Sequence, residues 1–163
     1  MSDHSLLMLL DEVRGKTVRI LRDTMDEESH WAPPGLHNHI LWHAGHSYVL
    51  VESLVTEAIG DLPQIPEGWF EIFSWESNPA KIASYRWPPL AQVIAKLTEQ
   101  QGRLRKLIAG LNDAQLSQPL PGRGNHTARY AIMHGLHDEA CHCGEIWLLR
   151  KLIRSSGSLT VQL

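Results

Sequence analysis

Apolar residues recur every three to four positions in four stretches of the chain, a spacing typical of helices with one buried face. The pattern predicts helices over residues 4 to about 25, 36 to about 59, 90 to about 110, and 127 to about 153. Gly60 and Gly110 fit the ends of the second and third helices, because glycine readily closes a helix. Two of the connections are short and one is long. We therefore expect an all-α fold, a four-helix bundle with a long crossover between its second and third helices.

The long crossover, residues 61–89, is rich in both proline and aromatic residues. Proline at this density excludes a long helix, and large aromatic side chains are too apolar to remain in water. A long connection inside a compact domain is usually functional or packed on itself. We expect an ordered segment that covers one end of the bundle. Its aromatic residues, together with one from the second helix, are expected to pack in the core and shape a pocket: Trp42, Trp69, Phe73, Trp75 and Trp87.

The chain of 163 residues has the size of one domain, so we expect a single domain over residues 1–163. A net charge of −3 without a basic stripe argues against a nucleic-acid partner. No apolar run approaches the roughly 20 residues of a membrane span, and the acidic start does not resemble a secretory signal. Cys141 and Cys143 would point in nearly opposite directions on a helix, which argues against an internal disulfide. These features favour a cytoplasmic protein.

The ten histidines are concentrated in the second and fourth predicted helices. Buried titratable groups cost free energy unless they are paired or bound to a metal. At helical spacing, three histidines share one face of the second helix, and a row of histidines and carboxylates follows the fourth: His39, His43 and His46, then His134, Asp138, His142 and Glu145. Facing rows of this kind predict a metal site between the helices. Two imidazoles and a carboxylate suit zinc, iron, nickel or manganese with positions left open.

Other titratable residues are given ordinary roles. Four histidines outside the rows are expected to be hydrogen-bonded core or surface residues: His4, His30, His37 and His126. Glu139 is expected to be a salt-bridge partner, and both cysteines to be inert helix residues. Glu145 is equally consistent with a surface residue and with an acceptor for the ring hydrogen of a ligand histidine.

Two segments carry a resemblance to a known family. The first is Trp42-His-Ala-Gly-His46, and the second runs from His137 to Ile146. In this order and at this distance they resemble the DinB/YfiT-like superfamily. The resemblance implies an up-down-down-up four-helix bundle that often forms homodimers. It also implies a divalent metal held by one histidine of the second helix and a His-x-x-x-His pair of the last.

Transferred residue by residue, the family ligands fall on His46, Asp138 and His142. The family has a histidine where this chain has Asp138. We favour Asp138 as a ligand, because a carboxylate binds the same metals. His134 or His137 could instead take its place through a shift of the helix, or the metal could be bound weakly or not at all.

The resemblance further implies an activity. Characterised members use the metal to activate a thiol, such as mycothiol or bacillithiol, and transfer it to a small electrophile. We therefore expect a metal-dependent thiol transferase or hydrolase with a small-molecule substrate. His43, Glu145 and His134 are expected to orient ligands or relay protons. Two alternatives remain: a non-catalytic small-molecule-binding or stress-response module, and a structural helical dimer with a histidine-rich core.

Overall fold

The structure is a computed structural model that describes residues 3–159. The predicted all-helical class is confirmed. Four long helices carry the fold: α1 (His4–Arg22), α3 (Ile40–Val51), α5 (Leu90–Gly110) and α7 (Ala128–Leu159). Three short helices lie in the connections: α2 (Asp26–Ser29), α4 (Trp69–Phe73) and α6 (Asp113–Ser117). A π-helical turn (Glu52–Thr56) and a 3-10 turn (Glu57–Ile59) continue α3.

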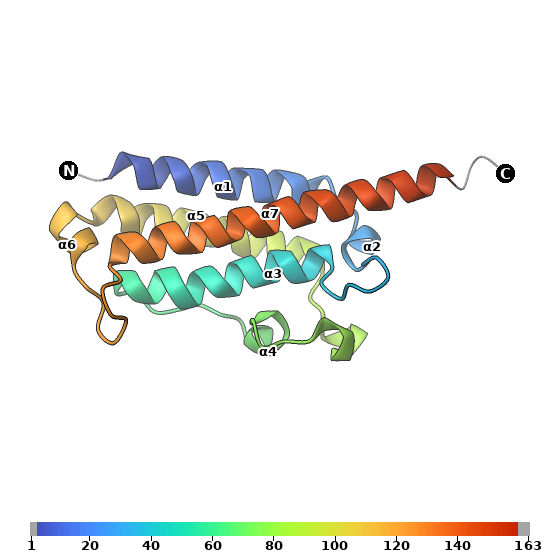
Figure 1. Ribbon diagram of the computed structural model, residues 1–163, viewed down its shortest axis with the longest axis horizontal. Coiled ribbons are helices and arrows are strands. Elements are labelled where there is room, and N and C mark those ends of the chain that lie inside the picture. Colours follow the sequence, from blue (N-terminus) through green and yellow to red (C-terminus); the bar gives the residue numbers. More distant parts are fainter. Residues whose placement is uncertain (1–2, 160–163) are drawn as a thin grey trace.

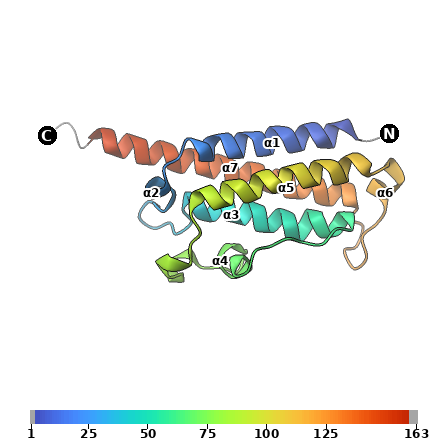
Figure 2. The same ribbon diagram turned by 180° about the vertical axis from the view of Figure 1, so that it is seen from behind.

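The four long helices lie side by side (Figure 1). Helices α1 and α7 run in one direction, and α3 and α5 run in the other, as the view from behind also shows (Figure 2). Helix α1 packs against α5 and α7, and α3 packs against the same two helices. The C-terminal end of α7 extends beyond the other long helices (Figure 1). Among the described helices, none combines the length and apolar character needed to cross a membrane.

The apolar faces of the helices form two buried clusters, one toward each end of the molecule. Leu21, Val93 and Ile146 belong to the first cluster, and Leu10 and Leu104 to the second. Burial of these side chains is the main force that holds the helices together. Along α1, α5 and α7, the residues between the two clusters include buried polar groups rather than only apolar ones.

The central polar group is Arg14, which is fully buried. Its Nε and Nη2 donate to the two carboxylate oxygens of Glu139 at 2.8 and 2.7 Å. Its Nη1 donates to the Leu97 carbonyl at 2.6 Å, and Nη2 also donates to Gln100 Oε1 at 2.7 Å. Gln100 in turn donates to Glu52 at 2.7 Å. The predicted role of Glu139 as a salt-bridge partner is confirmed, and the network links all four long helices.

The second predicted helix begins later than the sequence pattern indicated. Its predicted start was residue 36, but α3 begins at Ile40. Pro33 and Pro34 precede a turn at Gly35, whose φ of 88° is left-handed, and the chain is not helical again until His39 caps α3. Local turn geometry therefore overrides the apolar spacing here.

Two further boundaries were also misplaced. The first helix was predicted to reach about residue 25, but α1 ends at Arg22 and Asp23 caps it. The last was predicted to end at Ile153, whereas α7 continues to Leu159. Residues 155–159, which the apolar spacing left outside the helix, therefore belong to α7, and residues 160–163 lie outside the described residues. The crossover is ordered as predicted and contains α4 and two 3-10 turns (Pro79–Lys81 and Ser84–Arg86).

Candidate metal centre

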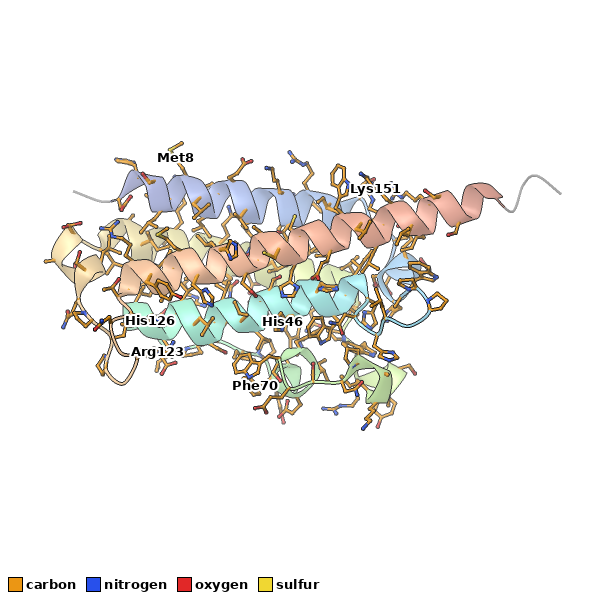
Figure 3. The ribbon with its side chains drawn as sticks, in the orientation of Figure 1. Met8, His46, Phe70, Arg123, His126 and Lys151 are labelled. Atoms are coloured by element: carbon orange, nitrogen blue, oxygen red, sulfur yellow. The ribbon has the colours of Figure 1, made fainter. Side chains whose placement is uncertain are left out.

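The packing of α3 against α7 brings the two histidine-containing segments together. His46 of α3 faces Asp138 and His142 of α7, and one donor atom from each lies within 4.8 Å of the others. Figure 3 labels His46 on α3. The imidazole of His46 is buried, whereas the other two side chains are partly exposed. These are the three residues that the family resemblance named as ligands.

A second group of possible ligands shares His142 with the first and adds His43 and Glu145. The Nδ1 atoms of His43 and His142 lie 2.9 Å apart. Glu145 Oε2 lies 3.0 Å from His43 Nδ1 and 2.9 Å from His142 Nδ1. The sequence predicted both added residues as partners of the centre, and the structure places both next to His142.

The orientation of His46 depends on the close approach of α4 to α3. A Cβ at Gly45 would lie 2.2 Å from the Phe73 ring, so only glycine allows this packing. The Phe73 carbonyl then lies 2.6 Å from His46 Nδ1. Since a carbonyl can only accept, Nδ1 carries the ring hydrogen and Nε2 keeps a free lone pair. Burial lowers the pKa of His46, and the Phe73 carbonyl opposes this effect only in part, so the ring stays neutral at pH 7.

Trp42 fixes the same imidazole from another side. Its ring stacks on His46 with centroids 4.6 Å apart and planes 12° from parallel. Its Nε1 donates to Ser77 Oγ at 2.8 Å, which ties the ring to the crossover. Histidines that bind metals are commonly held in this way by neighbours that fix the ring and one of its nitrogens.

Asp138 offers a buried carboxylate oxygen to the same centre. Its Oδ2 is buried and has no hydrogen-bond partner within the described part of the chain. It lies 3.4 Å from His142 Nε2. An unsatisfied buried carboxylate oxygen costs free energy, and a cation would remove this cost. Together with two imidazole nitrogens, this oxygen forms a donor set that fits a divalent transition metal.

The other histidines have separate environments. His134 belongs to neither group of possible ligands among the described residues, and its ring stacks on Tyr130 at 5.6 Å beside a different cavity. His137 is exposed, with Cys141 Sγ 4.0 Å from its Nε2. His39 accepts a hydrogen bond from the Trp42 backbone and caps α3. His134 and His137, the two alternatives to Asp138 as a ligand, therefore lie outside the candidate centre.

His43 is the most deeply buried imidazole of the second group. Burial, reinforced by the nearby His142 and His46, lowers the pKa of His43 to about 3. At neutral pH the ring is therefore neutral and offers a lone pair rather than a positive charge.

A cavity of about 380 Å³ opens beside this second group. His43 and Glu145 line it together with Leu148 and Leu149. Residues 35–38, in the loop before α3, form the rest of the lining. The sequence predicted a helix from residue 36, so it did not indicate that Leu36, His37 and Asn38 lie in a loop beside the site.

The five aromatic residues predicted to shape a pocket lie in three different environments. Trp42 and Phe73 are buried and pack around His46. Trp69 and Trp87 line a separate cavity of about 460 Å³ between the crossover and α5. Trp75 is exposed, with its ring edge on Phe70. None of the five lines the cavity beside His43 and Glu145.

Cys141 and Cys143 are both free, as predicted from their spacing. Cys141 is exposed, whereas Cys143 is buried, and this burial raises the pKa of its thiol. Neither belongs to a group of possible metal ligands among the described residues.

Comparison with known proteins identifies the family. The family model of the DinB superfamily matches residues 9–146. Among solved structures, the chain is similar to one described as the conserved protein of locus from Enterococcus faecalis, with a TM-score of 0.78 at 15% sequence identity. This similarity covers 95% of this chain and 99% of the other, and it shows a shared fold. No curated protein matches the sequence.

Proposed function

Because the chain belongs to the DinB superfamily, we propose that it is a metal-dependent enzyme in which His46, Asp138 and His142 hold a divalent transition metal. The observation that carries this proposal is the buried Asp138 Oδ2, which faces two imidazoles and has no hydrogen-bond partner within residues 3–159. A purely structural pair of helices gains nothing from an unsatisfied carboxylate at this position.

A bound metal of this kind lowers the pKa of a coordinated thiol or water and so supplies a nucleophile at neutral pH. The protein supplies orientation. The Phe73 carbonyl and the Trp42 ring fix His46 so that Nε2 faces the centre. Glu145 Oε2 accepts the Nδ1 hydrogen of His142, which leaves Nε2 of that ring beside Asp138.

The cavity beside His43 and Glu145 is the proposed substrate site. Its volume of about 380 Å³ falls in the range of small-molecule sites. Leu36, Leu148 and Leu149 supply apolar walls, and His37 and Asn38 supply polar contacts. These features support a small substrate with an apolar part. We propose transfer of a low-molecular-weight thiol to this substrate, or its hydrolysis by water.

The same family membership leads us to propose an up-down-down-up four-helix bundle, and the helix directions in Figures 1 and 2 support it. We further propose a cytoplasmic homodimer. Trp147 and Leu152 of α7 are 50% and 40% exposed, and this part of the helix is the proposed contact with a second copy. Sedimentation of wild type and Leu152→Arg tests the dimer, since a charge in the interface should yield monomers. Wild type that sediments as a monomer contradicts it.

Metal analysis tests the proposed centre. Protein should be purified without a nickel column, dialysed against Zn²⁺ and then analysed for bound metal. Wild type should retain zinc, whereas His46→Ala and His142→Ala should lose most of it. His134→Ala is the matched control, because this histidine lies on the same helix but outside both groups. Equal zinc in all four proteins would refute the centre.

Turnover separates the enzyme from a binding module. The zinc protein should accelerate loss of a small thiol in the presence of a small electrophile, and Asp138→Asn should abolish the acceleration. Zinc binding without turnover over a panel of thiols and electrophiles would favour the binding module. No zinc binding and no rise in melting temperature with zinc would favour the structural dimer, because a metal that binds only the folded state must stabilise it.

A further inference from the structure

The proposed metal centre explains only one contact in the second group of donor atoms, which lies on His43, His142 and Glu145: the hydrogen bond from His142 to Glu145. In that centre His142 uses Nε2, which lies beside Asp138. Its Nδ1 lies on the other side of the ring, 2.9 Å from both His43 Nδ1 and Glu145 Oε2. The remaining distance, between His43 Nδ1 and Glu145 Oε2, is 3.0 Å.

These three atoms share too few hydrogens for three hydrogen bonds. A neutral imidazole has one ring hydrogen, and a carboxylate has none. At most two hydrogens therefore lie among the three atoms. At least one of the three contacts, at 2.9, 2.9 and 3.0 Å, then joins two lone pairs or two N–H groups.

The spacing of the three atoms matches that of metal ligands. Nitrogen and carboxylate oxygen bind first-row metals at about 2.1 Å, so two ligands at a right angle are about 3.0 Å apart. The observed separations of 2.9, 2.9 and 3.0 Å are those of one face of such a coordination shell. Two histidines and a carboxylate on one face leave the opposite positions free.

The position of the group gives an ion access and a role. His43 is buried, whereas the Glu145 side chain is 54% exposed. Both line the cavity of about 380 Å³, so an ion that they bind faces the space proposed for the substrate. Such an ion could hold a carboxylate or carbonyl oxygen of the substrate next to the first metal.

We propose that a second divalent metal ion binds His43, His142 and Glu145. The two sets of ligands then share His142, and each ion binds one nitrogen of its imidazole. The second ion replaces the Nδ1 hydrogen of His142, which leaves as a proton to the solvent. This inference rests on the proposed metal centre, because only an ion already held by Nε2 makes His142 a bridge between two metals.

The number of bound ions tests the proposal. Metal-free protein should be equilibrated with Zn²⁺, and zinc per chain measured for wild type, Glu145→Gln and the control Glu76→Gln. Glu145 is exposed, so its substitution leaves the core undisturbed, and unchanged melting curves of the metal-free proteins verify this. Wild type and Glu76→Gln should bind two ions per chain, and Glu145→Gln one.

The possible outcomes separate the two proposals. One ion in wild type and in Glu145→Gln overturns the second site and leaves the first intact. A third outcome is one ion in wild type that Glu145→Gln loses and Asp138→Asn keeps. The group with His43 would then be the single metal site, and this also overturns the proposal that His142 bridges two ions. No bound ion in wild type overturns the proposed function itself.

Copper gives an independent spectroscopic test. Two Cu²⁺ ions joined by one imidazole ring couple magnetically, so the electron paramagnetic resonance signal per copper falls at low temperature. Wild type loaded with Cu²⁺ should show this loss, and Glu145→Gln should recover the full signal of an isolated ion. Full signal per copper in wild type contradicts a shared His142.

Discussion

Asp138 is the residue at which the proposed centre departs from the three-histidine pattern that the family resemblance implied. A carboxylate differs from an imidazole in carrying a full negative charge at neutral pH. Here one of its oxygens is buried with no hydrogen-bond partner within the described residues. The metal-free protein therefore bears a cost at this position that a bound cation would remove. Affinity for metal and stability without metal should respond in opposite directions to changes of this side chain.

Asp138→Asn tests this opposition. The neutral amide is cheaper to bury than the carboxylate, so the metal-free variant should be more stable than wild type by about 1 kcal/mol. Its zinc affinity should fall by at least about tenfold, since a charged ligand is lost. Urea unfolding in chelator measures the first effect, and competition with a zinc indicator measures the second. Asp138→His is the matched variant and should keep zinc binding, because it restores the family pattern. Loss of both stability and affinity in Asp138→Asn would indicate a structural role only.

The proximity of the candidate ligands could be predicted from the sequence because helical spacing indicates which side chains share a face. His46, Asp138 and His142 come together as predicted, and His43 and Glu145 join them. Spacing along one helix could not show how far His134 lies from the facing helix. That distance depends on where α3 and α7 cross, and the crossing is set by packing rather than by local pattern.

At the scale of helices, the position of α4 depends on Gly45. An added methyl group there would overlap the Phe73 ring, so Gly45→Ala should push α4 away and move the carbonyl that holds His46. We expect a loss of about 1–3 kcal/mol in the free energy of unfolding, together with weaker zinc binding. Gly15→Ala in α1 is the control, because its added Cβ meets no other atom within 4 Å. It should gain up to about 1 kcal/mol from higher helix propensity. Denaturant unfolding should show a lower free energy of unfolding for Gly45→Ala and an unchanged or higher one for Gly15→Ala.

The start of α3 should make stability depend on pH. His39 accepts the Trp42 backbone hydrogen bond, and burial, with a smaller effect of His30, lowers the pKa of His39 to about 4 from 6.5. As pH falls, His39 is therefore protonated in the unfolded chain before it is protonated in the folded protein. The contribution of the neutral His39 ring to the free energy of unfolding is complete above pH 6.5. It is lost between pH 6.5 and 4, by about 3 kcal/mol at most. His39→Asn keeps a good cap without a titrating group. Unfolding free energies at pH 7 and 4 should differ less in this variant than in wild type, and equal differences would contradict the assignment.

The presence of the four long helices could be predicted more reliably than the residues at which they begin and end. Apolar spacing correctly located the four long helices, because it records which face is buried. It placed the start of α3 too early, since Leu36 fits the spacing but lies in the turn that follows Pro33 and Pro34. Residues 35–38 of the same turn line the cavity proposed as the substrate site.

At the scale of the whole molecule, a buried polar network separates the two apolar clusters. Arg14, Gln100 and Glu52 come from three different long helical segments and are each almost fully buried. Sequence reasoning missed all three, because a polar residue on a helix is expected to face solvent unless a distant partner is known. Only Glu139 was assigned a salt bridge, and its partner Arg14 is 125 residues away in the chain.

Removal of one partner of this network should destabilise the whole molecule. In Glu139→Gln the Arg14 guanidinium would remain buried without its counter-charge, and breaking such a pair costs about 3–5 kcal/mol. The control is Glu12→Gln, which breaks the exposed pair with Lys16 in the same helix as Arg14 and should cost far less. The double variant Arg14→Met, Glu139→Leu should recover much of the loss, because it removes both charges together. Urea unfolding monitored by circular dichroism would give the three values. A cost for Glu139→Gln no larger than for Glu12→Gln would mean that the Arg14 side chain reaches water, and that the network does not hold the helices together.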